Sequence, residues 1–139
     1  GVQGVLSVTV FDQGTGQSVT RSCNVILINN GTPAPPLTVS VDYAQVEGFS
    51  DSGDPVTSAA TMTASGAVGA VTWNWTRVSG SGSPISPSSQ STQFGTYMNY
   101  NGTETGSFQG TATDSLGRTS PPVTVAATFR NHFYTGPFN

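Results

Sequence analysis

Apolar and polar residues alternate along most of this chain, and the alternation has a period of two residues. Near the start, "VLSVTVF" sets Leu6, Val8 and Val10 against polar neighbours. Successive side chains of a β-strand point to opposite faces, so this pattern predicts a strand with one apolar face. The strongest case is "AVTWNWTRVSG", in which Trp73 and Trp75 fall on the same face. No segment shows a convincing helical period.

The pattern recurs often enough to predict about seven short strands with turns roughly every 8–12 residues. Runs of Gly, Ser, Asn, Asp and Pro separate the strands, and these residues favour turns. Many short strands without helices between them are typical of an all-β, antiparallel two-sheet sandwich. The expected strands are 5–11, 23–27, 37–46, 57–64, 70–80, 92–100, 107–114 and 121–129.

Proline and glycine divide the chain into parts. "NGTPAPP" at 30–36 is typical of a short, stiff linker. We therefore expect a β-hairpin over residues 1–29, this linker, a sandwich over 37–130, and an aromatic C-terminal tail over 131–139.

The opening hairpin resembles the end of the expected sandwich. Leu6, Val8, Val10 and Asp12 align at a constant offset with a later set, Phe108, Gly110, Ala112 and Asp114. Cys23, Val25 and Leu27 then match Val123, Val125 and Ala127 if two extra turn residues are allowed. Residues 1–29 are thus predicted to be the C-terminal remnant of a preceding sandwich, because a lone hairpin is marginal in water. The alternative is that two hairpins resemble each other by chance.

Composition excludes several classes of function. Charged residues make up 8% of the chain, Lys is absent, and the net charge is -3. Without a basic cluster, nucleic-acid binding is not expected. No run approaches the roughly 20 apolar residues of a membrane span, so we expect no membrane insertion. The single cysteine, Cys23, cannot form a disulfide within the chain and is interpreted as a small apolar residue.

Catalysis and metal binding find little support in the sequence. His132 is the only histidine and lies in the tail, where no scaffold would hold it as a base. Glu47, Asp51 and Asp54 form an acidic stretch that could offer oxygen ligands to calcium. Asp, Ser and Gly are also ordinary turn formers, so we interpret this stretch as a turn. The sequence therefore predicts no catalytic residues, no cofactor and no metal.

Aromatic residues supply the candidate contact surfaces. His132, Phe133, Tyr134 and Phe138 follow the last expected strand, and exposed aromatics usually find a partner surface. We expect them to contact a neighbouring subunit; the alternative is that they fold back over the domain's own edge. Trp75 and Phe108 are interpreted as core residues. Trp73, Tyr97 and Tyr100 are the candidates for contact with a glycan.

Three stretches resemble a known family. "WTRVSG" at 75–80, "SPSSQSTQF" at 86–94 and "FQGTATDSLG" at 108–117 are similar to the immunoglobulin-like modules of tail and other virion proteins of double-stranded DNA bacteriophages. The likeness spans roughly residues 37–130. It departs from the family at Gly110, where the family often carries a cysteine.

The resemblance implies an immunoglobulin-like sandwich and a non-enzymatic structural role on the virion, in a tail or decoration protein. Implied partners are other virion subunits, in a homo-oligomer, and a host-surface glycan during host attachment. Two alternatives remain open, and the second of them shares the expected fold. A carbohydrate-binding module would use the exposed aromatic residues named above, and a bacterial adhesin repeat would be one of several tandem modules.

Overall fold

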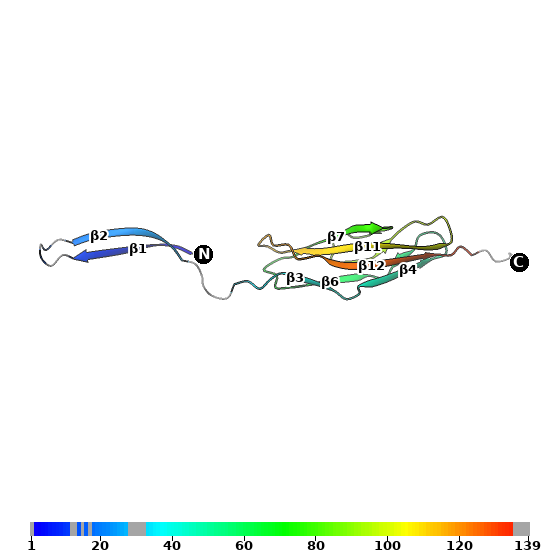
Figure 1. Ribbon diagram of the computed structural model, residues 1–139, viewed down its shortest axis with the longest axis horizontal. Helices are drawn as coiled ribbons and strands as arrows, with labels where there is room; N and C mark the ends of the chain where they lie inside the picture. Colours follow the sequence, from blue (N-terminus) through cyan, green and yellow to red (C-terminus); the bar gives the residue numbers. More distant parts are fainter. Residues whose placement is uncertain (1, 12–13, 15, 17, 28–32, 135–139) are drawn as a thin grey trace. The chain divides into compact units, whose positions relative to one another are not determined.

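The computed structural model describes residues 2–11, 14, 16, 18–27 and 33–134, and the chain divides into two compact units, Gly1–Pro33 and Ala34–Asn139 (Figure 1). Within these described ranges every regular element is a β-strand. No helix there is long and apolar enough to cross a membrane.

The first unit is a hairpin of β1 (Val2–Phe11) and β2 (Ser18–Leu27). The two strands are antiparallel and pair without a shift, from Val2 opposite Leu27 to Phe11 opposite Ser18. Residues 12–13, 15 and 17 of the connection lie outside the described residues.

The pairing corrects the expected alignment of this hairpin with the end of the sandwich, formed by β11 (Gly102–Thr113) and β12 (Val123–Asn131). Leu6 pairs with Cys23, and Phe108 pairs with Val125. Phe108 stands 102 positions after Leu6, and Val125 stands 102 positions after Cys23. One offset therefore serves both strands. The expected match of Cys23 with Val123, and the two extra turn residues, are wrong.

The second unit contains two sheets. The larger has seven strands in the order β7-β11-β12-β4-β5-β10-β8, and the smaller has three in the order β3-β6-β9. The strands not yet given bounds are β3 (Thr38–Val41), β4 (Gln45–Ser50), β5 (Val56–Thr57), β6 (Ala60–Ser65), β7 (Thr72–Gly80), β8 (Ser83–Pro84), β9 (Ser91–Thr92) and β10 (Phe94–Gly95).

The strand order is that of an immunoglobulin-like sandwich, and the predicted fold class is confirmed. Such sandwiches place strands A, B and E in one sheet and C, F and G in the other. Here β3, β6 and β9 take the A, B and E positions, and β7, β11 and β12 take C, F and G. Trp75 on β7 corresponds to the buried tryptophan of strand C.

One strand pair departs from the expected antiparallel arrangement: β4 runs parallel to β12. After β3 the chain crosses to the larger sheet within Asp42–Ala44 and continues along the sandwich without reversing (Figure 1). It therefore reaches β12 running in the same direction as that last strand.

The core lies between the two sheets and is centred on three aromatic rings. Trp75 meets Phe94 edge to face with centroids 5.6 Å apart, and Phe94 stacks on Phe108 at 4.2 Å. Trp75 is 2% exposed and Phe108 is fully buried, so their prediction as core residues is confirmed. The rest of this cluster is Val46, Ala60, Met62, Met98, Val125, Ala127 and Phe129.

Gly110 occupies the strand F position where antibody domains carry the second cysteine of the disulfide between the sheets. A Cβ at Gly110 would lie 2.5 Å from Sδ of Met62, on strand β6, and 3.0 Å from the Trp75 ring. The thioether of Met62 thus fills the space over strand F, next to the tryptophan. Thioether packing here replaces the covalent link.

The predicted strand 92–100 is only partly correct. The structure has the short strands β9 and β10 there, and Tyr97–Tyr100 is irregular. Thr92, Phe94 and Met98 are nevertheless buried, so the alternation reflects burial. The chain changes partners along this stretch, from β6 in the small sheet to β5 and β8 in the large one. The pattern of a single strand cannot reveal such a change of sheet.

Candidate functional site

The first candidate site is the end of the sandwich at which β12 finishes, here called the tail end. It is built from Ser50 at the end of β4, the loops 51–55 and 96–101, and residues 131–134. Asn131, the last residue of β12, is 2% exposed and joins them. Its Oδ1 accepts a hydrogen bond from the Gly53 amide at 2.9 Å, and its Nδ2 donates to the Tyr100 carbonyl at 2.9 Å.

The acidic loop 51–55 is held by the Ser50 hydroxyl at the end of β4 and by backbone groups. Ser50 Oγ accepts the amides of Ser52 and Asp54 at 3.0 and 3.2 Å. The Met98 amide donates to the Gly53 carbonyl at 2.7 Å, so this loop is tied to the loop 96–101. Hydrogen bonds between residues close together in the sequence therefore organise this loop, as the interpretation of this stretch as a turn requires.

The three carboxylates of the acidic stretch do not gather around one point. Asp51 and Asp54 are exposed, and Glu47 lies on β4, 3.6 Å from Arg130 Nη2. Within the part of the chain that the structure describes, no three His, Cys, Asp or Glu side chains form a group that could hold a metal ion.

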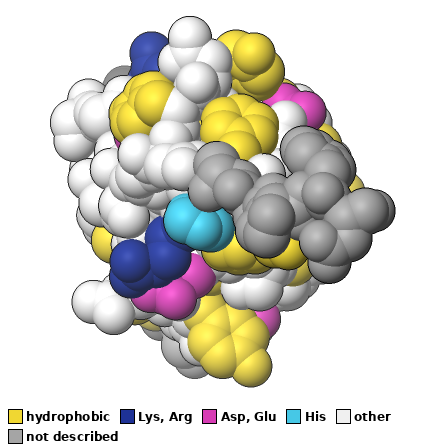
Figure 2. Space-filling model, turned by 90° about the vertical axis from the view of Figure 1, so that its right-hand side faces the viewer, with side chains coloured by type: hydrophobic (Ala, Val, Ile, Leu, Met, Phe, Trp, Pro, Cys, Tyr) yellow, Lys and Arg dark blue, Asp and Glu magenta, His cyan; other side chains and the backbone are white. Residues whose placement is uncertain are grey.

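Aromatic rings from two segments meet over Gly53. A Cβ at Gly53 would lie 3.5 Å from the Phe133 ring and 3.5 Å from the Tyr97 ring. The Phe133 amide donates to Oδ1 of Asn101 at 2.7 Å, which fixes the chain just after β12. Tyr97 is 70% exposed and Tyr134 is 75% exposed. Figure 2 looks onto this end and shows hydrophobic side chains at several places on its surface, with Arg and acidic side chains beside the histidine.

The predicted interface residues therefore fall at the tail end as far as they are described. His132 and Tyr134 are exposed, and Phe133 is half-buried. The His132 amide donates to the Ser50 carbonyl at 3.0 Å, while Phe138 lies outside the described residues. Phe133 thus packs against its own domain, as the fold-back alternative expects, and Tyr134 is exposed; contact with a neighbouring subunit stays a prediction.

Tyr100 is 48% exposed and is tied to β11 through its hydroxyl. The hydroxyl donates to Oε1 of Glu104 at 2.5 Å. This hydrogen bond raises the pKa of Tyr100, and the bonds from Ser81 and then Tyr100 lower the pKa of Glu104. The ring of Tyr100 is thus oriented along the large sheet.

Trp73 lies far from the two tyrosines with which it was grouped as a glycan contact. It pairs with Ala112 near the end of β11, whereas Tyr100 comes just before Gly102 at the start of that strand. Ten residues of a strand span about 33 Å. Trp73 is also half-buried against the core. The three residues cannot contact one small glycan together.

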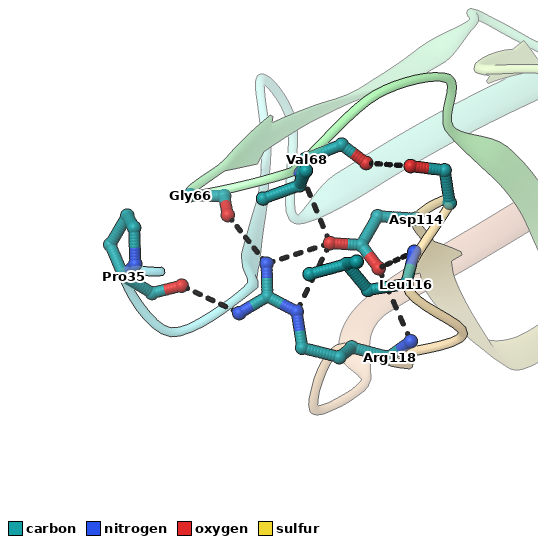
Figure 3. Close-up of polar contacts among 7 residues, drawn as sticks. Pro35, Gly66, Val68, Asp114, Leu116 and Arg118 are labelled. Atoms are coloured by element: carbon teal, nitrogen blue, oxygen red, sulfur yellow. Dashed lines mark hydrogen bonds and ion pairs between the residues drawn. The ribbon is translucent and has the colours of Figure 1, made fainter. Parts of the chain in front are cut away.

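The opposite end of the sandwich, here called the linker end, contains an ion pair between the buried Asp114 and the partly exposed Arg118, which the pattern of apolar and polar residues does not predict. Asp114, after β11, is 5% exposed, and its Oδ2 accepts from Nη2 of Arg118 at 2.7 Å and from Nε at 3.1 Å. The remaining Arg118 donors reach the carbonyls of Pro35 and Gly66, both at 2.8 Å (Figure 3).

The same carboxylate also holds two loops. Asp114 accepts the amide of Val68 at 3.1 Å and those of Leu116 and Arg118 at 3.1 and 3.2 Å. The Arg118 hydrogen bonds lower the pKa of Asp114 to about 2, against the opposing effect of burial. The string "TDSLGR" carried the signal, since an Asp before a glycine turn and an Arg four residues later suit this arrangement.

Among the comparisons with known proteins, only the one with solved structures finds similar chains. No family model and no curated protein matches the sequence. A PKD domain of human KIAA0319 aligns with 83% of this chain and 98% of its own, at 10% identity and a TM-score of 0.46. The D00-D0 domain of intimin aligns with 87% of this chain at 15% identity and a TM-score of 0.30, and the chain spans 64% of its length.

Proposed function

We propose that this chain is a non-enzymatic structural and interaction module on the surface of a bacteriophage particle. The observation that carries the interaction role is the tail end. There Tyr97 and Tyr134 stand exposed on loops that the buried Asn131 holds in place. Aromatic side chains on a fixed scaffold are typical anchors of protein interfaces, because little conformational entropy is lost on binding.

The sandwich interior supports a structural rather than a catalytic role. The core between the sheets is filled by packed aromatic and aliphatic side chains. The strongest electrostatic pair, Asp114 with Arg118, is saturated by hydrogen bonds within the domain. Neither the core nor this ion pair presents a side chain placed to transfer a proton to a substrate.

The virion assignment rests on the resemblance of "WTRVSG" and "FQGTATDSLG" to phage modules, and particle labelling tests it. Antibodies raised against residues 34–134 are expected to decorate purified phage particles in immunogold electron microscopy. Digestion of the same particles should yield peptides of this chain. Purified particles whose peptides lack the chain, while the infected cell contains it, would reject the virion role.

The tail end is tested by substitution of one exposed tyrosine at a time. Tyr97→Ser and Tyr134→Ser should each weaken self-association or particle incorporation about tenfold, as loss of an interface tyrosine commonly does. Tyr43→Ser is the matched control, because Tyr43 is 59% exposed in the turn between β3 and β4. Sedimentation velocity over a concentration series measures the effect. Equal behaviour of all three variants would exclude the tail end as the contact surface.

A carbohydrate-binding role is the second candidate, favoured by the exposed rings of Tyr97 and Tyr100 at one end of the domain. Exposed aromatic faces suit the apolar faces of sugar rings. Glycan-array binding that is lost in Tyr97→Ala and kept in Trp73→Ala would support this role, because Trp73 lies at the other end. Absence of binding to any glycan would exclude it.

A further inference from the structure

The hairpin β1–β2 repeats the register of the strand pair β11–β12 over most of its length. Val8 opposite Arg21 corresponds to Gly110 opposite Val123, and both residues of the later pair stand 102 positions further along the chain. Next to the turn the two pairings differ, because Phe11 pairs with Ser18 whereas its counterpart Thr113 bridges to Thr119. The register therefore agrees along the body of the two strand pairs, from Val2 opposite Leu27 to Val8 opposite Arg21, and differs next to the turn.

The sequence of the hairpin carries the interior pattern of that strand pair. The buried residues of β11 and β12 have counterparts in β1 and β2 that are glycine or apolar. Exposed residues such as Thr105, Thr124 and Ala126 correspond to the polar Gln3, Ser22 and Asn24. The buried positions and their counterparts are Gly106 and Gly4, Phe108 and Leu6, Gly110 and Val8, Ala112 and Val10, Val125 and Cys23, Ala127 and Val25, and Phe129 and Leu27.

A buried polar position is repeated as well. Ser120 is 4% exposed and its Oγ accepts the Ala112 amide at 3.0 Å; its counterpart is Ser18, the first residue of β2. In sequence alone, Asp114 and Asn131 also have identical counterparts, Asp12 and Asn29, which lie outside the described residues. Identical polar residues at buried positions are not required by a solvated hairpin.

Unit 1 contains counterparts of β11 and β12 but of no other strand of the sandwich within its described residues. In unit 2 those two strands are covered by β7 on one side, by β4 on the other, and by the small sheet across the core. A two-stranded hairpin with one apolar face is marginal in water. Its interior face therefore needs a cover of the kind that residues 37–101 provide in unit 2.

We propose that β1–β2 is the F–G strand pair of a second immunoglobulin-like sandwich, and that its apolar face binds a segment equivalent to residues 37–101. We assign this segment to the same polypeptide, N-terminal to Val2. The repeat distance of 102 positions carries that assignment, because it matches the length of one sandwich with its linker, as tandem repeats require. The inference does not depend on the virion role.

The test adds the missing cover to the full chain. A second copy of residues 34–102 is joined directly before Gly1 and carries Met62→Ala, because Val8 stands at the position of Gly110, where a Cβ would lie 2.5 Å from Met62. This extended chain should form a second sandwich with β1–β2 as its last strands. Hydrogen exchange of β1 and β2 amides, followed by NMR, should slow at least a hundredfold relative to residues 1–139 alone. Unchanged exchange in the extended chain would overturn the proposal.

Two variants of the extended chain separate specific docking from unspecific burial. Leu27→Ser should abolish the added protection, because its counterpart Phe129 is fully buried. Asn24→Ser should keep it, because its counterpart Ala126 is exposed. Equal effects of the two variants would overturn the assigned register.

The denatured mass of the natural polypeptide tests the source of the cover. A mass well above 14.3 kDa, with an additional immunoglobulin-length segment before Val2, supports the tandem arrangement. A natural chain of 14.3 kDa would overturn the tandem arrangement if its hairpin amides are protected only in an oligomer. The segment that covers the hairpin would then belong to a second copy of the chain.

Discussion

At the scale of single residues, buried polar side chains hold this domain's loops. Charged residues are few, yet Asp114, Ser120 and Asn131 are each at most 5% exposed, and each accepts backbone amides. In the described part of the chain every buried side-chain nitrogen and oxygen has a partner. Loss of one partner leaves another buried group unsatisfied, so these positions should tolerate substitution poorly.

The pH dependence of stability should reveal Asp114. Its pKa is lowered to about 2 in the folded protein from an ordinary value of 3.8. A lowered folded-state pKa stabilises the fold above pH 3.8, and this contribution is lost as the pH falls from 3.8 toward 2. Asp114→Asn should lower the melting temperature at pH 7 and flatten its decline between pH 4 and 2. Calorimetry checks this, with the exposed Asp51→Asn as control. An unchanged acid profile in Asp114→Asn would contradict the assignment.

Gly110 should resist even a methyl group. Gly110→Ala would place a carbon against the fully buried Met62 and the Trp75 ring, and overpacking of this kind costs about 1–3 kcal/mol. Gly95→Ala is the control, because the nearest atom to its Cβ is 3.6 Å away. Urea unfolding measures both. In a chain that already carries Met62→Ala, Gly110→Ala should cost less free energy of unfolding, because the cavity left at position 62 accepts the added methyl group. Strictly additive effects of the two substitutions on that free energy would refute the contact.

At the scale of elements, Arg118 joins three parts of the linker end: the segment before β3, the β6–β7 loop and the β11–β12 turn. Arg118→Ala should therefore lower the melting temperature by several degrees and speed hydrogen exchange near Gly66 and Val68, because a buried carboxylate loses its partner. Arg118→Lys should rescue only partly, since an ammonium lacks the planar fork.

Arg130→Ala is the control for Arg118. Its pair with Glu47 is 3.6 Å apart and both side chains are more than half exposed, so little stability should be lost. Equal losses in Arg118→Ala and Arg130→Ala would mean that the contacts of Arg118 at the linker end contribute nothing special.

The positions of the strands could be predicted from the sequence, whereas their pairing could not. Alternation located the strands because burial of one face imposes it, and Trp75 and Phe108 were recognised as core on that basis. Alternation is silent about which strands pair, so the parallel contact of β4 with β12 and the split of 92–100 were missed. Of the aromatic residues expected to be exposed after the last strand, Tyr134 is exposed and Phe133 is half-buried. The roles of Asn131 and Arg118 depend on distant backbone groups that no local pattern contains.

At the scale of the whole molecule, the two units should be separable. The core of the sandwich is formed entirely by residues of the second unit, and Arg118 bonds within the same unit, to Pro35. A chain that begins at Ala34 should therefore keep the melting temperature of the full chain to within a few degrees.

The amide NMR spectrum of the shortened chain should also superimpose on the sandwich signals of residues 1–139. Ala34 is the right boundary for this comparison, because removal of Pro35 would also remove an acceptor of Arg118. A chain that begins at Leu37 should be less stable than one that begins at Ala34, although it lacks no core residue. If both shortened chains unfolded alike and well below the full chain, the sandwich would need the hairpin for its stability. The tandem arrangement, in which each sandwich completes its own core, would then be contradicted as well.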